Sequence, residues 1–406
     1  MMTKCFRTLR ALTVWLCIAA GLTSCHDDHK HTLYATSSEH TLLVYMAGDN
    51  SLNSYVTNNI YAMMSGLQQC DVPLNLIIYH DNRTATDKLP VLFQLRKRAD
   101  SNKVDTLWLK SWSEDVDSTD PEWMAKVIRT TFERFDSPVK GLEVWGHGLS
   151  WIPSSTFVAD AAPARAMEWV GQDDSDFGEL WELRQCIEAS GVHFDYMMFD
   201  ACHMASAEVA CELSGVTDHI LASSTEIMGN GFPYADMIRS LSTIQNADEV
   251  EAGLTSALLD YQNAYADNGT FSLIRTKGIS QLLDVCRRLE EQATPVLSLW
   301  AEAPATYEAR VQHYGRVSRK ARYYFYDVRQ WAELLAESAG GCDLAAFDEA
   351  LGQCVPAHYF SQRFTDGDEL LRIGSSCGLM MSVPQFWSLS GNDMLDAAYT
   401  KLQWQL

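Results

Sequence analysis

The residue best suited to act as a nucleophile is Cys202. It follows a run of mostly apolar residues, 194–199, which predicts a buried strand of a parallel sheet. From Met204 onward the chain is rich in Ala, Glu and Met, which predicts a helix. We therefore expect Cys202 at the carboxyl end of a strand, where open α/β sheets place their ligand crevices. It would also lie just ahead of a helix N-terminus, whose dipole and free N–H groups favour a thiolate over a thiol.

A thiol needs a neighbouring base to become a thiolate near neutral pH, and His147 is the best candidate. It follows a short predicted strand and lies between Gly146 and Gly148, which let another backbone come close. If the two strands are parallel neighbours, His147 and Cys202 share one sheet edge. A histidine about 50 residues upstream of the cysteine is also the spacing of caspases. The other candidate, His203, is adjacent to Cys202 and would point away from it, so a structural role is expected.

The elements around these residues predict an α/β fold. A strand at 41–47, a helix at 52–67 and a strand at 74–79 form the start of a βαβ sheet with right-handed crossovers. Further strands are expected at 91–96, 106–109 and 219–223, and helices at 121–135, 178–190, 247–266, 278–299, 304–338 and 343–351. The apolar segment 378–383 is a candidate strand that would return to the sheet.

One long segment lacks periodicity. Residues 150–177 are rich in Pro, Asp and small residues, which predicts a surface loop of a length that is usually functional or cleavable. Another loop, 225–234, is rich in Gly and follows the strand predicted at 219–223. It is therefore expected at the same sheet edge as Cys202.

Composition excludes several classes of protein. The 406 residues include 53 acidic and 31 basic ones, and the net charge of −22 argues against binding to nucleic acid or to anionic lipid surfaces. A hydrophobic fraction of 47% indicates a folded globular protein. The eleven cysteines include no C-x-x-C pair, so neither a zinc ribbon nor a redox motif is predicted.

The first 24 residues predict a lipoprotein signal peptide, 1–24. Basic residues precede the apolar run 11–20, which is too short to span a membrane. Leu22-Thr23-Ser24-Cys25 resembles a bacterial lipobox, which implies lipid attachment to Cys25; an ordinary signal peptide with a coincidental cysteine is the alternative. Residues 25–40 predict a flexible tether, and 26–28 resemble the acidic export tag of Bacteroidota lipoproteins. We expect a lipid-anchored protein of the cell envelope, in the outer membrane.

Three segments resemble the clostripain family of cysteine peptidases, the C11 group of the caspase-like clan CD. They are LVYMAGDNSL at 43–52, VWGHG at 144–148 and FDACHMA at 199–205, in the order of the family. Weaker matches lie at 270–274 and 376–381. Gly-His-Gly alone is a weak signal, whereas the three central motifs in order are specific.

The resemblance implies an α/β fold, a caspase-like α/β/α sandwich with a mainly parallel central sheet. It also implies a catalytic dyad of His147 and Cys202, with the backbone N–H groups of Gly148 and Cys202 as the oxyanion hole. Because the sequence pattern changes to amphipathic helices near residue 247, we expect the catalytic domain at 41–245. A mainly helical C-terminal region would follow at 246–406.

The resemblance further implies cleavage after Arg or Lys. In that family an Asp two residues before the nucleophile lines the S1 pocket, and Asp200 occupies that place. A buried carboxylate can pair bidentately with an arginine side chain. A capping role for Asp200 is the alternative.

The chain departs from the family pattern in two places. Asn230 stands where an acidic residue would support S1, which weakens the expectation of a strict Arg or Lys preference; Glu226 could compensate. Leu149-Ser150-Trp151 follows the Gly-His-Gly turn, where the family favours Ser-Gly-Trp.

Some family members are activated by self-cleavage between the catalytic His and Cys. Arg165 is the basic residue of the segment 152–182, so it is the predicted self-processing site. No cofactor is expected. Calcium stimulates some family members, but the acids at 173–176 lack EF-hand spacing, so no metal site is predicted.

These observations predict a secreted, lipid-anchored cysteine endopeptidase that works through a thioester acyl-enzyme. Its partners would be peptides or proteins with basic residues, and the lipid bilayer through Cys25. The alternative is an inactive, peptidase-like lipoprotein that acts as a binding or scaffold module. Retention of both His147 and Cys202 favours the peptidase, whereas the change at Asn230 favours the module.

Overall fold

The centre of the computed structural model is a nine-stranded sheet with the order β13-β10-β9-β8-β5-β1-β2-β3-β4. The structure describes residues 38–82, 89–153, 172–173, 176–316, 323–366, 369–387 and 393–406. The strands of this sheet are β1 (His40–Gly48), β2 (Asn75–Asn82), β3 (Val91–Lys97), β4 (Val104–Ser111), β5 (Val139–Trp145), β8 (Phe194–Asp200), β9 (Thr217–Ala222), β10 (Thr270–Arg275) and β13 (Ala357–Phe360).

The middle of the sheet is parallel and its two sides are antiparallel. Strands β9, β8, β5, β1 and β2 pair in parallel, while β3 and β4 on one side and β10 and β13 on the other pair antiparallel. Every residue of β1 is buried, which explains why this strand is a nearly continuous apolar run. All five parallel strands end at one edge, so loops that are far apart in sequence meet there.

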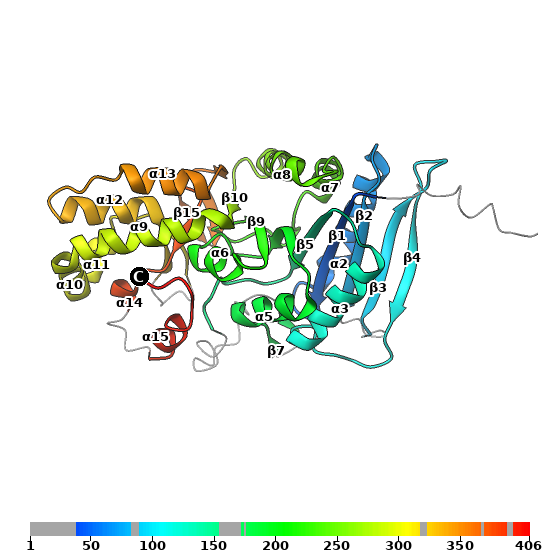
Figure 1. Ribbon diagram of the computed structural model, residues 1–406, viewed down its shortest axis with the longest axis horizontal. Helices are drawn as coiled ribbons and strands as arrows, with labels where there is room; N and C mark the ends of the chain where they lie inside the picture. Colours follow the sequence, from blue (N-terminus) through cyan, green and yellow to red (C-terminus); the bar gives the residue numbers. More distant parts are fainter. Residues whose placement is uncertain are drawn as a thin grey trace, which may run out of the picture.

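Helices cover both faces of the sheet (Figure 1). The first apolar core packs α3 (Pro121–Arg134), α5 (Leu180–Ser190) and α6 (Ala207–Leu213) against one face. The second core packs α2 (Asn53–Gln69), α7 (Tyr234–Ser242) and α8 (Val250–Ala264) against the other. The predicted α/β/α sandwich with a mainly parallel central sheet is confirmed.

The C-terminal region adds a layer of helices at the far end of the molecule (Figure 1). They are α9 (Ile279–Gln292), α10 (Thr294–Glu302), α11 (Pro304–Glu308), α12 (Val328–Ser338) and α13 (Ala345–Cys354). The predicted single helix at 304–338 is wrong, because α11 and α12 are separated by the strands β11 (His313–Arg316) and β12 (Tyr323–Asp327). The aromatic run at 323–326 explains this, since aromatic side chains favour strands.

The expectation that 378–383 returns to the central sheet is also wrong. The strand in this segment, β16 (Met380–Met381), pairs with β12 in a separate three-stranded sheet. Two other segments, β10 and β13, extend the central sheet beyond β9. The C-terminal region therefore shares the sheet of the predicted catalytic domain. The remaining elements are two short hairpins, β6 (Gln172–Asp173) with β7 (Asp176–Phe177) and β14 (Arg363–Asp366) with β15 (Glu369–Arg372), and the helices α14 (Pro384–Trp387) and α15 (Asp393–Tyr399).

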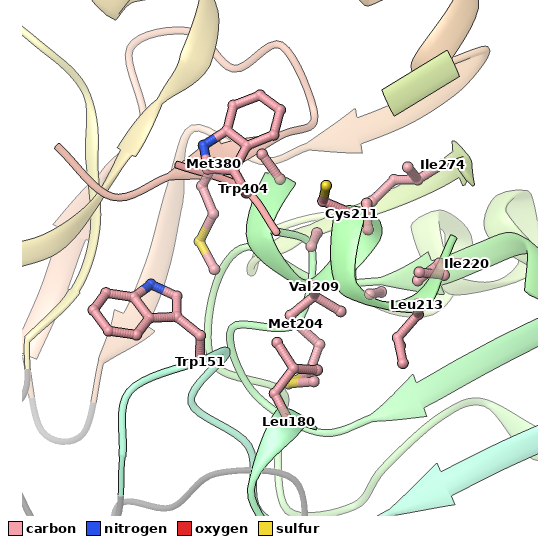
Figure 2. Close-up of a cluster of buried hydrophobic side chains, with 14 of the residues drawn as sticks. Trp151, Leu180, Met204, Val209, Cys211, Leu213, Ile220, Ile274, Met380 and Trp404 are labelled. Atoms are coloured by element: carbon pink, nitrogen blue, oxygen red, sulfur yellow. The ribbon is translucent and has the colours of Figure 1, made fainter. Parts of the chain in front are cut away.

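The end of the chain packs against α6, the helix that follows Cys202. Figure 2 shows Met380 and Trp404 next to Val209 and Cys211 of α6, and all four belong to one buried cluster. Every residue of α6 is buried. Among the residues that the structure describes, no helix is long and apolar enough to cross a membrane.

Candidate active site

His147 and Cys202 follow two neighbouring parallel strands at equal distances. The last pair in register between β5 and β8 is Trp145 with Asp200, and each candidate lies two residues beyond its strand. The backbone N–H of Gly146 donates to the carbonyl oxygen of Asp200 at 3.2 Å, which extends the pairing past the strands. The structure thus brings the predicted base and the predicted nucleophile to one sheet edge.

Gly148 lies directly against the backbone of Cys202. A Cβ atom at position 148 would be 2.7 Å from the carbonyl oxygen of Cys202 and 2.9 Å from the Cβ of Ala201. Both are rigid neighbours, so only glycine fits here. The Gly-His-Gly turn therefore brings the backbone of Gly148 next to that of Cys202. The backbone nitrogen of Cys202, the second predicted oxyanion donor, lies 3.2 Å from the same Cβ position.

The imidazole of His147 contacts a side chain that the sequence did not indicate. Its Nε2 atom lies 2.8 Å from Oγ of Ser51, in the turn between β1 and α2. A hydrogen bond to one ring nitrogen fixes the tautomer and the orientation of an imidazole. Ser51 belongs to the motif 43–52, but neither its residue type nor its spacing indicates a contact with His147.

The sulfur of Cys202 contacts the loop after β9. The backbone N–H of Ile227 donates to Sγ at 3.3 Å, and the carbonyl oxygen of Ile227 lies 3.9 Å from Sγ. An N–H donor stabilises a thiolate. The predicted helix N-terminus is not beside the thiol, because α6 begins at Ala207 and is capped by Ser206. The loop at Ile227 supplies the donor in its place.

The backbone next to Cys202 is strained. His203 has a φ of 56°, in the left-handed region that residues other than glycine rarely adopt, and Ser150 has a φ of 58°. The ring of His203 is buried, lies 2.9 Å from the carbonyl oxygen of Ser224 through Nδ1 and stacks on Phe325. Cys202 and this left-handed residue form a turn between the end of β8 at Asp200 and the start of α6 at Ala207.

Asp200 lies below the loop that follows β9. Its Oδ2 atom accepts hydrogen bonds from the backbone N–H of Phe232 at 3.1 Å and from the hydroxyl of Tyr234 at 2.6 Å. The side chain is 5% exposed, and burial raises the pKa of its carboxyl to about 6. A Cβ at Gly231 would lie 2.4 Å from Oδ2, and the φ of Gly231 is +71°, so this loop can cover the carboxylate only with glycine at that place.

Asn230 is exposed and belongs to the same loop. Its backbone oxygen accepts from the amide of Asn59, 2.9 Å away, and that amide also accepts from the indole of Trp145. The hydroxyl of Tyr265 donates to the carbonyl oxygen of Gly231 at 2.6 Å. Asn59 of α2 and Tyr265, the residue after α8, therefore hold the loop over Asp200 through its backbone, which leaves the side chain of residue 230 free to vary.

Other predicted site residues lie outside the described part of the chain: Cys25, the predicted lipidation site, and Arg165, the predicted self-processing site. Asp173 is described and buried. It accepts from the backbone N–H of Ser118, and burial raises the pKa of its carboxyl to about 7. In the described ranges, no group of three or more His, Cys, Asp or Glu could hold a metal ion. Each of the eight cysteines in these ranges is a free thiol.

A cysteine and a histidine at the carboxyl edge of a caspase-like sandwich define a cysteine peptidase. The clostripain family, Peptidase C11, matches residues 44–343, and the chain belongs to this family. It is a cysteine endopeptidase that acts on peptides, and peptidases of this family need no cofactor.

Solved structures agree with this assignment. An inactive zymogen of a C11 protease from Parabacteroides distasonis is 26% identical, with a TM-score of 0.75 over 92% of this chain and 98% of that one. A secreted C11 cysteine protease from Bacteroides thetaiotaomicron, in complex with an irreversible peptide inhibitor, is 21% identical, with a TM-score of 0.71 over 90% of this chain and 98% of that one. Among curated proteins, none matches this chain.

Proposed function

We propose that the protein is a lipid-anchored endopeptidase that cleaves after Arg or Lys through His147 and Cys202. His147 takes the thiol proton of Cys202, and the thiolate attacks the carbonyl carbon of the scissile bond. The N–H groups of Gly148 and Cys202 bind the oxyanion. His147 then protonates the leaving amine, and water hydrolyses the thioester acyl-enzyme.

The observation that carries this mechanism is the contact between Gly148 and Cys202. It puts two backbone segments with N–H groups against each other at the sheet edge where the thiol lies. The hydrogen bond between Ser51 and Nε2 of His147 supports the same mechanism, because it helps to orient the ring.

The preference for Arg or Lys is supported by Asp200. Both hydrogen bonds to this carboxyl go to Oδ2, so Oδ1 is the oxygen that would receive the substrate cation. With a pKa of about 6, the carboxyl is mainly ionised at neutral pH. An ionised, largely desolvated carboxylate favours a cationic side chain.

The test compares fluorogenic peptides that carry Arg, Lys or a neutral residue at P1, with Cys202→Ala as the matched control. Cleavage after Arg or Lys that the variant lacks, by about 10⁴-fold or more in kcat, is the expected result. Cleavage only after neutral residues would contradict the proposed specificity. Equal activity of the wild type and Cys202→Ala would contradict the dyad.

Anchoring through Cys25 suits the orientation of the fold. Strand β1 begins at His40, the last residue of the predicted tether, and ends at Gly48 on the edge that carries His147. A tether at Cys25 would therefore leave the molecule at the end opposite the catalytic edge and present that edge away from the membrane. Metabolic labelling with a fatty acid tests the anchor: we expect label in the wild type and none in Cys25→Ala.

Self-processing at Arg165 is the remaining element of the proposal. It is supported by the position of this residue between His147 and Cys202 and by the proposed preference for Arg. Incubation of the active enzyme should produce two chains, whose new N-terminus is Ala166. Arg165→Ala should remain one chain, as should Cys202→Ala. Cleavage of Arg165→Ala at an unchanged rate would contradict the site.

A further inference from the structure

The hydroxyl of Tyr234 lies between two buried carboxyl groups. Its oxygen is 2.6 Å from Oδ2 of Asp200 and 2.5 Å from Oε1 of Glu143. Glu143 comes from β5, Asp200 from the neighbouring strand β8, and Tyr234 from the first turn of α7, which packs over both strands. Glu143 has no role in the mechanism above, although it is fully buried two residues before Trp145.

The two short contacts require a second proton. A tyrosine hydroxyl carries one hydrogen, so it can donate to only one of the two carboxyl oxygens. The other contact is a hydrogen bond only if that carboxyl is protonated and donates to the phenol oxygen. Glu143 suits this role: its Oε2 atom is buried and has no hydrogen-bond partner among the described residues. An unpartnered oxygen costs less on a neutral carboxyl than on a carboxylate.

The charges around Glu143, Asp200 and Tyr234 also favour a protonated Glu143. The titratable groups that face the two carboxyls are Tyr196, Tyr234, Tyr261 and Tyr265. His40 contacts the hydroxyl of Tyr196 at 2.8 Å, and burial lowers the pKa of His40 to about 4, so it is neutral. No lysine or arginine in the described part of the chain offsets a second negative charge here.

Burial and the charge of Asp200 together raise the pKa of Glu143 well above its ordinary value. Asp200 is the better place for a negative charge because its Oδ2 accepts hydrogen bonds from Phe232 N–H and from Tyr234, whereas Oε2 of Glu143 has no hydrogen-bond partner among the described residues. The single negative charge of the cluster is therefore located on Asp200 at neutral pH, with the proton on Glu143.

We propose that Glu143 is a positioning residue for substrate specificity. It keeps a proton at neutral pH and turns the Tyr234 hydroxyl toward Asp200. Asp200 therefore stays ionised for the basic P1 residue. The chain of donors runs from the Glu143 carboxyl to the Tyr234 oxygen and from the Tyr234 hydroxyl to the Asp200 carboxylate. This inference rests on the proposed cleavage after Arg or Lys, because it explains how Glu143 and Tyr234 set the charge of Asp200, the proposed recognition group.

Infrared spectroscopy tests the proton on Glu143 without any substrate. At about pH 8, above the pKa of Asp200, the difference spectrum between the wild type and Glu143→Gln should contain one carbonyl stretching band of a buried carboxylic acid. Cys202→Ala should retain the band. A difference spectrum that contains only carboxylate bands would show that Glu143 is ionised and would overturn the proposal.

Steady-state kinetics test the link to specificity. For Arg substrates, KM of the wild type should rise as the pH falls through about 6, where Asp200 becomes protonated, with kcat less affected. Tyr234→Phe removes a donor to Asp200, so the midpoint should move upward by about one to two pH units. Glu143→Leu should move it in the same direction by less, and Glu143→Gln, which can still donate, should restore the wild-type midpoint.

The outcomes separate the two proposals. A midpoint for Glu143→Gln that is lower than in the wild type would show that a negative charge had been removed, which overturns the proton on Glu143. Midpoints that do not respond to Tyr234→Phe would overturn the coupling to Asp200. Turnover of a neutral P1 peptide shows that each variant is folded. If the wild type cleaves no basic P1 peptide, the proposed function fails, and the infrared band still decides whether Glu143 is protonated.

Discussion

At the scale of single residues, a contact with the turn between β1 and α2 helps to orient His147. Replacement of Ser51 by Ala removes the 2.8 Å hydrogen bond to Nε2 and lets the ring turn. A hydrogen bond of about 1 kcal/mol corresponds to about a 5-fold decrease in kcat, with KM nearly unchanged. Ser54→Ala, on the exposed side of α2, is the matched control and should keep the wild-type kcat. An unchanged kcat in Ser51→Ala would exclude a positioning role for this serine.

Gly148 is the residue whose replacement should harm catalysis most without touching the dyad. An added methyl group would lie 2.7 Å from the carbonyl oxygen of Cys202, so the two backbones must separate and the oxyanion donors move apart. Loss of one such donor costs about 100- to 1000-fold in kcat, and we expect Gly148→Ala to show a decrease in that range.

Gly215→Ala provides the control for this substitution, because nothing lies within 4 Å of a Cβ at that position. It should retain the kcat of the wild type. Circular dichroism of both variants checks that the fold is intact. A Gly148→Ala enzyme with less than 10-fold loss would mean that the N–H of residue 148 does not bind the oxyanion.

Residue types and positions alone could predict His147 and Cys202 as the candidate pair, because an imidazole and a thiol that each follow a buried strand are unusual. Ser51 and Glu143 could not be predicted in this way. Serine is common in turns, and a glutamate inside an apolar strand gives no sign of which side chain will face it. Ser150 occupies the place where the family favours glycine, and its φ of 58° shows why glycine is favoured there.

At the scale of elements, the loop over Asp200 is the part of the proposed specificity site that should tolerate substitution best. Its backbone is fixed by Asn59 and Tyr265, whereas the side chain of Asn230 is exposed. Asn230→Asp should therefore add a negative charge near the proposed S1 pocket without altering the loop. Since exposed ion pairs contribute up to about 1 kcal/mol, we expect the preference for Arg over a neutral P1 residue to rise by roughly 2- to 5-fold in kcat/KM.

The salt dependence checks that this effect is electrostatic. The gain in Asn230→Asp should shrink at high ionic strength, because salt screens exposed charges. Asn102→Asp, at an exposed position in the turn between β3 and β4, controls for the overall charge and should not change the ratio. A ratio for Asn230→Asp equal to that of the wild type would place residue 230 outside the S1 pocket.

The parallel strands could be predicted because their burial on both faces makes them continuous apolar runs. Strands β10 and β13 were missed as members of the central sheet because sheet membership depends on contacts with β9 that are distant in sequence. The hairpin β11–β12 lies inside a stretch whose composition also suits a helix, and pairing with β16 decides in favour of strands. Such non-local contacts leave no local pattern in the chain.

At the scale of the whole molecule, the C-terminal segment is hydrogen-bonded to α6, the helix after Cys202. Glu208 accepts from the backbone N–H of Ser382 at 2.7 Å, and Glu212 accepts from that of Gln403 at 3.1 Å. Trp404, fully buried, packs in the same cluster (Figure 2). The two halves therefore fold around one core, and the stability of the catalytic edge depends on the end of the chain.

Buried acids make this core sensitive to pH. Burial raises the pKa of Asp81 and Asp200 to about 6, and that of Asp173, Glu208 and Glu290 to about 7. The folded state therefore binds more protons than the unfolded state between about pH 4 and pH 7, and stability falls as the pH rises through that window. His40 acts in the opposite direction, since its lowered pKa of about 4 reduces stability as the pH falls below 6.5.

Glu208→Gln isolates one member of this group. Its Oε1 atom binds Ser382 N–H, while its Oε2 atom is buried without a hydrogen-bond partner in the described residues, so the amide keeps the bond to the C-terminal segment and removes the ionisation. With a folded pKa of about 7 against 4.5, the wild type should lose about 2 kcal/mol more stability than the variant between pH 5 and pH 8. Urea unfolding at the two pH values measures the difference.

The control is Glu291→Gln, at an exposed position on α9, which should have the stability of the wild type at both pH values. Parallel losses in wild type and Glu208→Gln would mean that Glu208 is ionised throughout, and the contact with Ser382 would then hold a buried charge.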